Sequence, residues 1–97
     1  MKVTIVGLIT PHVLRVIDLA RQAESGANVD WHLRDAVART VAELGQQYNA
    51  RDLLQAYAHG LEAAANAADA TGPARKGYVG VLQAAATMAM RQLQIHE

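Results

Sequence analysis

Two histidine–carboxylate pairs are the clearest candidates for chemistry in this sequence. His59 is followed three residues later by Glu62, and His32 is followed by Asp35 in the same way. Side chains three residues apart share one face of a helix, so each pair has the spacing to supply two metal ligands. A di-iron bundle needs a Glu-x-x-His motif on each of two helices, and the sequence contains none. Because cysteine is also absent, we expect no metal site and no bound cofactor.

His59 also introduces phosphoryl transfer as an alternative. The run His59-Gly60-Leu61-Glu62-Ala63 resembles the pattern of histidine phosphotransfer domains, which is His, any residue, Leu, Lys, Gly. That resemblance implies a helical bundle whose exposed His59 carries the phosphoryl group. Glu62 stands at the lysine position of the pattern, where its charge repels a phosphoryl group. A histidine phosphotransfer-like carrier is therefore the first alternative, and we expect His59 to lie at the surface.

A helix-turn-helix-like DNA-binding regulator is the second alternative. The run Val41-Ala42-Glu43-Leu44-Gly45 resembles the first half of that motif. The match ends after it, because Gln46 replaces an apolar residue and Asp52 falls where the second helix needs a packing residue. Nine basic and nine acidic residues give a formal net charge of zero, which provides no attraction to nucleic acid or to anionic lipid. We expect neither as a partner.

The sequence lacks a pattern typical of nucleophilic catalysis. Ser25 is the only serine, and no histidine lies near it in the sequence. We therefore expect a protein without enzymatic activity; an active site assembled between subunits, which need leave no local motif, is the alternative that stays open. No apolar run approaches the roughly 18 residues of a membrane-spanning helix, and Gly7 and Pro11 interrupt the apolar start of the chain. The expected location is the cytoplasm.

Alanine, the strongest helix former, predicts the elements that position these residues. It is concentrated in the second half of the chain, for example in Ala63–Ala65 and Ala84–Ala86. The sequence therefore predicts an all-α protein, a small four-helix bundle in a single domain over residues 1–97. Its helices are expected at about 11–24, 30–44, 50–70 and 73–95, and the small alanine side chains should let them approach closely.

The ends of the expected helices follow from capping and breaking residues. Thr10 can cap a helix that begins at Pro11, and Ser25-Gly26 can end it. The β-branched residues before this point predict a short strand or extended arm over residues 1–9. Asn28 or Asp30 can cap the second helix, Gly45 ends it, and Pro73 opens the fourth. The second helix has one regular buried stripe, formed by Leu33, Ala36, Val37, Thr40, Val41 and Leu44.

Large side chains outside the expected core indicate how the protein acts. Trp31, Tyr48 and Arg51 are of the types that dominate binding energy at interfaces, so we expect them to bind a protein partner. The fourth helix is apolar on two sides, and the second side predicts contact with another copy through Val79, Ala86, Met90 and Leu93. The leading hypothesis is a small non-enzymatic interaction module, a regulator, adaptor or inhibitor, that works as a homo-oligomer.

Overall fold

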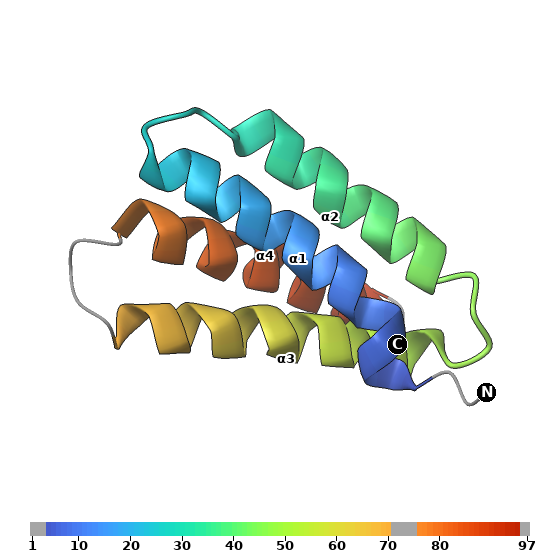
Figure 1. Ribbon diagram of the computed structural model, residues 1–97. Coiled ribbons are helices and arrows are strands. Elements are labelled where there is room, and N and C mark those ends of the chain that lie inside the picture. Colours follow the sequence, from blue (N-terminus) through green and yellow to red (C-terminus); the bar gives the residue numbers. More distant parts are fainter. Residues whose placement is uncertain (1–3, 71–75, 96–97) are drawn as a thin grey trace.

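Four helices form the part of the chain that the structure, a computed structural model, describes, namely residues 4–70 and 76–95 (Figure 1). They are α1 (Ile5–Glu24), α2 (Asp30–Leu44), α3 (Ala50–Asp69) and α4 (Lys76–Ile95). The predicted all-α four-helix bundle is confirmed, and three of the four expected ranges agree closely with the observed ones. The expected role of Pro73 falls outside the described residues.

The predicted start of the first helix is wrong, because α1 begins at Ile5 rather than at Pro11. Thr4 is the N-cap residue, and its hydroxyl oxygen accepts a 3.0 Å hydrogen bond from the Gly7 amide. The hydroxyl of Thr10, which we expected to cap, instead donates to the carbonyl of Val6, one turn back. Residues 5–9 are thus helical, and the expected strand or extended arm is wrong over them; residues 1–3 lie outside the described part.

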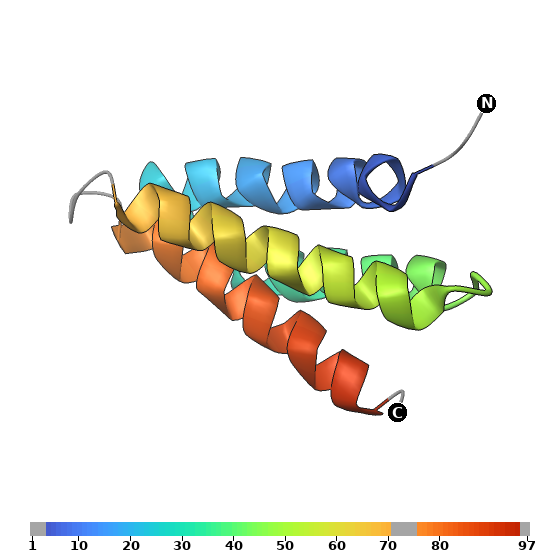
Figure 2. The same cartoon turned by 90° about the horizontal axis from the view of Figure 1, so that it is seen from below.

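Pro11 lies inside α1, where a proline has a structural cost. It has no amide hydrogen for the carbonyl four residues earlier, and its ring crowds that carbonyl. Figure 2 shows the first turn of α1 turned aside from the axis of the rest of the helix, as is typical of a proline kink. The helix therefore continues on the N-terminal side of Pro11 as far as the residue capped by Thr4. Pro11 by itself does not indicate this additional turn.

The predicted buried stripe of α2 is confirmed at all six positions, since each of these residues is buried. Its start differs in detail from the prediction. Val29 is the N-cap residue and forms no side-chain capping bond, while the Asn28 side chain accepts a 3.1 Å hydrogen bond from the Asp30 amide. The predicted ends at Ser25-Gly26 and Gly45 are confirmed, and Gly26 has a φ of 101°, a conformation that glycine adopts without strain.

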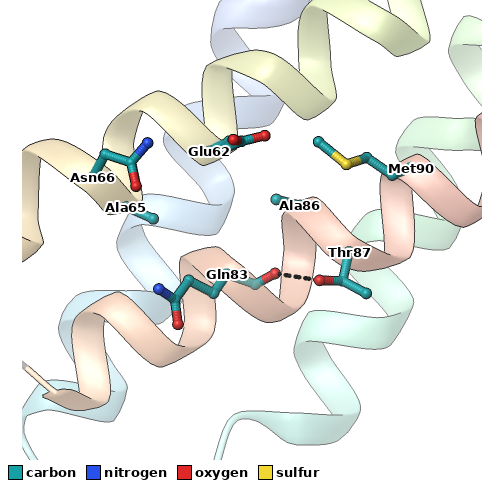
Figure 3. Close-up of a pocket in the computed structure, with 7 residues that line it drawn as sticks. All are labelled: Glu62, Ala65, Asn66, Gln83, Ala86, Thr87 and Met90. Atoms are coloured by element: carbon teal, nitrogen blue, oxygen red, sulfur yellow. Dashed lines mark hydrogen bonds between the residues drawn. The ribbon is translucent and has the colours of Figure 1, made fainter.

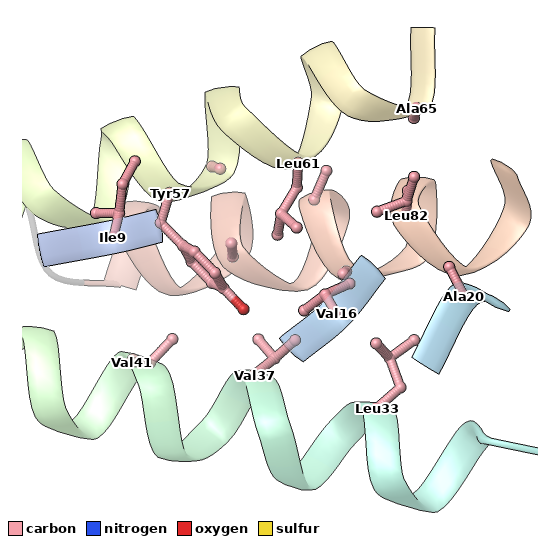
Figure 4. Close-up of a cluster of buried hydrophobic side chains, with 14 of the residues drawn as sticks. Ile9, Val16, Ala20, Leu33, Val37, Val41, Tyr57, Leu61, Ala65 and Leu82 are labelled. Carbon is pink, nitrogen blue, oxygen red and sulfur yellow. The ribbon is translucent and has the colours of Figure 1, made fainter. Parts of the chain in front are cut away.

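The core lies between all four helices, and α3 and α4 make the most extensive contact (Figure 4). Alanines on both helices are buried, among them Ala65 on α3 and Ala85 and Ala89 on α4. A buried alanine lets two helix backbones approach closely. The bulky core side chains come mainly from leucine and valine, together with Tyr57, which is fully buried. The expected close approach of the alanine-rich helices is therefore confirmed.

Helix α4 contacts all three other helices of this chain. One side packs on α3, and the other packs on α1 and α2. Val79 and Ala86, which we expected at a contact with another copy, are 7% and 5% exposed in the chain's own core. Little of either side chain is exposed, although Ala86 also lines a groove between α3 and α4, and a contact between copies through these residues stays a prediction. Met90 and Leu93 are half-buried at the edge of this core.

Among the described residues, no helix combines the length and the apolar content that crossing a bilayer requires.

Candidate functional site

Trp31 is the most prominent functional candidate at the surface. It lies in the first turn of α2, and 71% of its surface is exposed. Its indole ring contacts the imidazole of His32 edge to face, with ring centroids 5.3 Å apart. Because the core is filled without it, Trp31 is not needed to complete the packing of the chain. An exposed tryptophan of this kind is typical of an interaction surface.

A shallow groove of about 270 Å³ lies between α1 and α2, and its lining includes His32, the residue whose ring Trp31 contacts. Leu19 and Ala36 give it an apolar portion, and the edge is polar. Asp35 and Arg39 form an ion pair of 3.0 Å along α2; because both side chains are exposed, the pair contributes little to stability. The polar lining is formed by Arg15, His32, Asp35 and Arg39. We call Trp31 together with this groove the Trp31 surface.

The structure does not bring the three predicted partner-binding residues together. Tyr48, which is 100% exposed, and Arg51 lie at the junction of α2 and α3, whereas Trp31 lies at the start of α2. The 15 residues of α2 separate them, a length of about 22 Å at 1.5 Å per residue. A single small pocket on a partner cannot contact both ends. Of the three residues, Trp31 precedes and contacts His32, which lines a groove between α1 and α2.

A polar cluster joins α1, α2 and α3 in the part of the bundle where α2 ends. His12 of α1 is mostly buried, with 14% of its side chain exposed. Its Nδ1 lies 3.2 Å from the Thr40 hydroxyl and its Nε2 lies 3.5 Å from the Glu43 carboxylate, both on α2. Its ring meets the Tyr57 ring of α3 edge to face at 6.5 Å. In the tautomer that has its proton on Nε2, the His12 Nε2–H group points toward the Glu43 carboxylate. Its Nδ1 atom then accepts a hydrogen bond from the Thr40 hydroxyl.

The Tyr57 hydroxyl is buried in this cluster and makes no hydrogen bond within the described part of the chain. Figure 4 shows its oxygen directed from α3 toward α2. Burial raises the pKa of the Tyr57 phenol above its ordinary value, while the neighbouring Thr40 hydroxyl and the charge of Arg15 act in the opposite direction. A phenol with a raised pKa stays protonated at neutral pH. The cluster therefore links α1, α2 and α3 through polar and aromatic contacts within the core.

His59 lies at the surface of α3, as the sequence predicts. Glu62 lines the same hollow, of about 320 Å³, together with Ala63 and Asn66. An anionic carboxylate therefore borders the site where a phosphoryl group would sit. No set of three or more His, Asp or Glu side chains within residues 4–70 and 76–95 is close enough to hold a metal ion.

The arrangement of α2 and α3 bears on the DNA-binding alternative. In Figure 1, α3 runs back toward the end of the molecule from which α2 starts. The two helices of a DNA-binding helix-turn-helix instead cross steeply, at about 90–120°. This arrangement does not favour a recognition helix at α3.

Sequence reasoning missed His12 and its contact with Glu43. The error followed from the expected start of the first helix at Pro11, which made His12 an end residue rather than one in the middle of a helix. Thr40 was one available signal, since it is the single polar residue in the buried stripe of α2 and is 1% exposed. A buried hydroxyl requires a hydrogen-bond partner, and Tyr57 on a neighbouring inward stripe is a second polar group of the same kind.

Comparison of the chain with protein-family models, with curated proteins and with solved structures finds no match.

Proposed function

We propose that this protein is a non-enzymatic interaction module that binds another protein through the Trp31 surface. The observation that carries the proposal is the 71% exposure of Trp31 beside a groove with an apolar portion. Burying an indole in an interface removes a large apolar area from water, and such residues often dominate binding energy. Leu19 and Ala36 are the apolar residues that line the neighbouring groove.

The polar edge of the Trp31 surface indicates what a partner must offer. Arg15 lines the groove and forms no ion pair among the described residues. An acidic side chain of the partner can pair with its guanidinium, while an apolar side chain covers Trp31. We therefore propose a partner segment that combines an apolar anchor with a nearby carboxylate. Binding of this kind is sufficient for a regulator, adaptor or inhibitor.

Photo-crosslinking tests the proposal in cells of the organism that produces this protein, where its natural partners are present. A photoreactive phenylalanine analogue replaces Trp31 in one version of the protein and Gln55, an exposed residue of α3, in another. The proposal predicts a defined covalent adduct with one other protein from position 31 and not from position 55. Adducts of the same size and amount from both positions, or none from position 31, would show that the Trp31 surface does not bind a protein.

A further inference from the structure

A second groove lies between α3 and α4 and has a volume of about 400 Å³ (Figure 3). Its floor is formed by Ala65 and Ala86, whose small side chains leave the space open. Glu62 lines it from α3, and Thr87 and Met90 line it from α4. In Figure 3 the Glu62 carboxylate and the Met90 side chain lie on facing sides of this space.

Among the residues that line this groove, Glu62 is the charged one and it is negative, while the side-chain amides of Asn66 and Gln83 can both donate and accept hydrogen bonds. The Thr87 hydroxyl donates a 3.0 Å hydrogen bond to the carbonyl of Gln83, so its oxygen retains only acceptor capacity toward a ligand. Glu62 makes no hydrogen bond or ion pair with another described residue, and no basic side chain lines the groove. A positively charged donor with an aliphatic stem complements this lining, because the stem can pack on Met90.

Such a donor is present next to the groove in the same chain. Arg91 follows Met90 on α4, is exposed, and makes no hydrogen bond or ion pair among the described residues. The exposed face of α4 near the groove has small residues, Gly80 and Thr87. A Cβ atom added at Gly80 would meet no other atom within 4 Å, so the space above this residue is open. A second helix can therefore approach this face closely.

We propose that two copies of this protein associate through the α3/α4 groove, with Glu62 of each copy paired to Arg91 of the partner subunit. A two-fold axis repeats every contact, so a patch with one unpaired acid and one unpaired base complements itself. The guanidinium of Arg91 enters the groove of the other copy, and its stem lies along Met90. This self-association uses none of the residues of the Trp31 surface.

A charge-reversal series tests the pairing. Light scattering over a range of protein concentrations gives the dimer dissociation constant of the wild type, of Glu62→Arg, of Arg91→Glu and of the double variant. Each single reversal places like charges opposite each other twice in the dimer, so we expect the dissociation constant to rise at least about tenfold. The double variant restores opposite charges and should dimerise about as well as the wild type.

Controls separate a lost contact from a lost fold. Asp18→Arg makes the same change of charge on an exposed residue of α1 and should leave the dissociation constant unchanged. Circular dichroism checks the helical content of each variant, and Glu62→Gln replaces Glu62→Arg if the larger side chain prevents folding. A monomeric wild type, a dimer insensitive to Glu62→Arg, or a double variant that stays monomeric would each overturn this proposal and leave binding at Trp31 unaffected.

Discussion

At the scale of single residues, the cluster of His12, Thr40 and Tyr57 shows how polar side chains are accommodated in this core. The Thr40 hydroxyl of α2 and the Nδ1 atom of His12 in α1 form a hydrogen bond of 3.2 Å. The Tyr57 hydroxyl is the buried side-chain polar atom that finds no such partner among the described residues. Burying a hydroxyl without a hydrogen bond costs about 1–3 kcal/mol. The buried ring of Tyr57 therefore raises the free energy of unfolding, whereas its buried hydroxyl lowers it.

Replacing Tyr57 by phenylalanine tests this assignment. Tyr57→Phe keeps the ring and removes the unpaired oxygen, so we expect the free energy of unfolding to stay equal or to rise by up to about 1 kcal/mol. Urea denaturation of both proteins at neutral pH measures the difference. A loss of more than about 1 kcal/mol would mean that the hydroxyl has a stabilising hydrogen bond.

The raised pKa of Tyr57 predicts an effect of alkaline pH on stability. The folded chain holds the phenolic proton to higher pH than the unfolded chain does. The unfolded chain therefore binds fewer protons above about pH 10, and stability falls as the pH rises through that range. Wild type should lose more free energy of unfolding than Tyr57→Phe between about pH 9 and about pH 11. Equal losses in the two proteins would argue against a perturbed phenol.

At the scale of helices, small residues determine how closely α3 and α4 pack. Ala85 is fully buried at the centre of the core, and native cores have little unfilled space. A larger side chain there has to push the helices apart.

Ala85→Leu should lower the free energy of unfolding by about 1–3 kcal/mol, the usual cost of overpacking. Thermal unfolding followed by circular dichroism measures the change. Ala67→Leu is the matched control, because Ala67 is exposed on α3; it should change stability by less than about 0.5 kcal/mol. If Ala85→Leu is as stable as the control, the core around Ala85 is not closely packed in the native protein.

The helices also show which parts of the fold the sequence could predict. The stripe of α2 was predictable because its apolar residues repeat with helical spacing and all face one core. The start of α1 was not, because Thr10-Pro11 and Thr4 are both acceptable starts; in the structure Thr4 caps the helix, and Ile9 of the added turn is buried in the core. The second apolar side of α4 was recognised, but local sequence does not show that α1 and α2 return to cover it.

At the scale of the whole molecule, the two proposed surfaces lie on different helix pairs. The Trp31 surface belongs to α1 and α2, and the groove with Glu62 belongs to α3 and α4. A dimer formed through the second groove therefore leaves Trp31 accessible in both copies. Such a dimer presents two Trp31 surfaces to a partner, and a partner with two binding segments gains apparent affinity from this arrangement. Trp31 could be named as a candidate binding residue from its residue type. The groove between α1 and α2 could not be predicted, because it depends on how these two helices pack.

The most direct test of partner binding through Trp31 is the affinity for the protein captured by crosslinking. Calorimetric titration compares wild type, Trp31→Ala and Tyr48→Ala with that purified partner. Because a central tryptophan anchor contributes about 2 kcal/mol or more, Trp31→Ala should weaken binding by at least about thirtyfold. Tyr48→Ala, at the other end of α2, should bind within about twofold of wild type. Equal affinities for Trp31→Ala and wild type would contradict the proposed function.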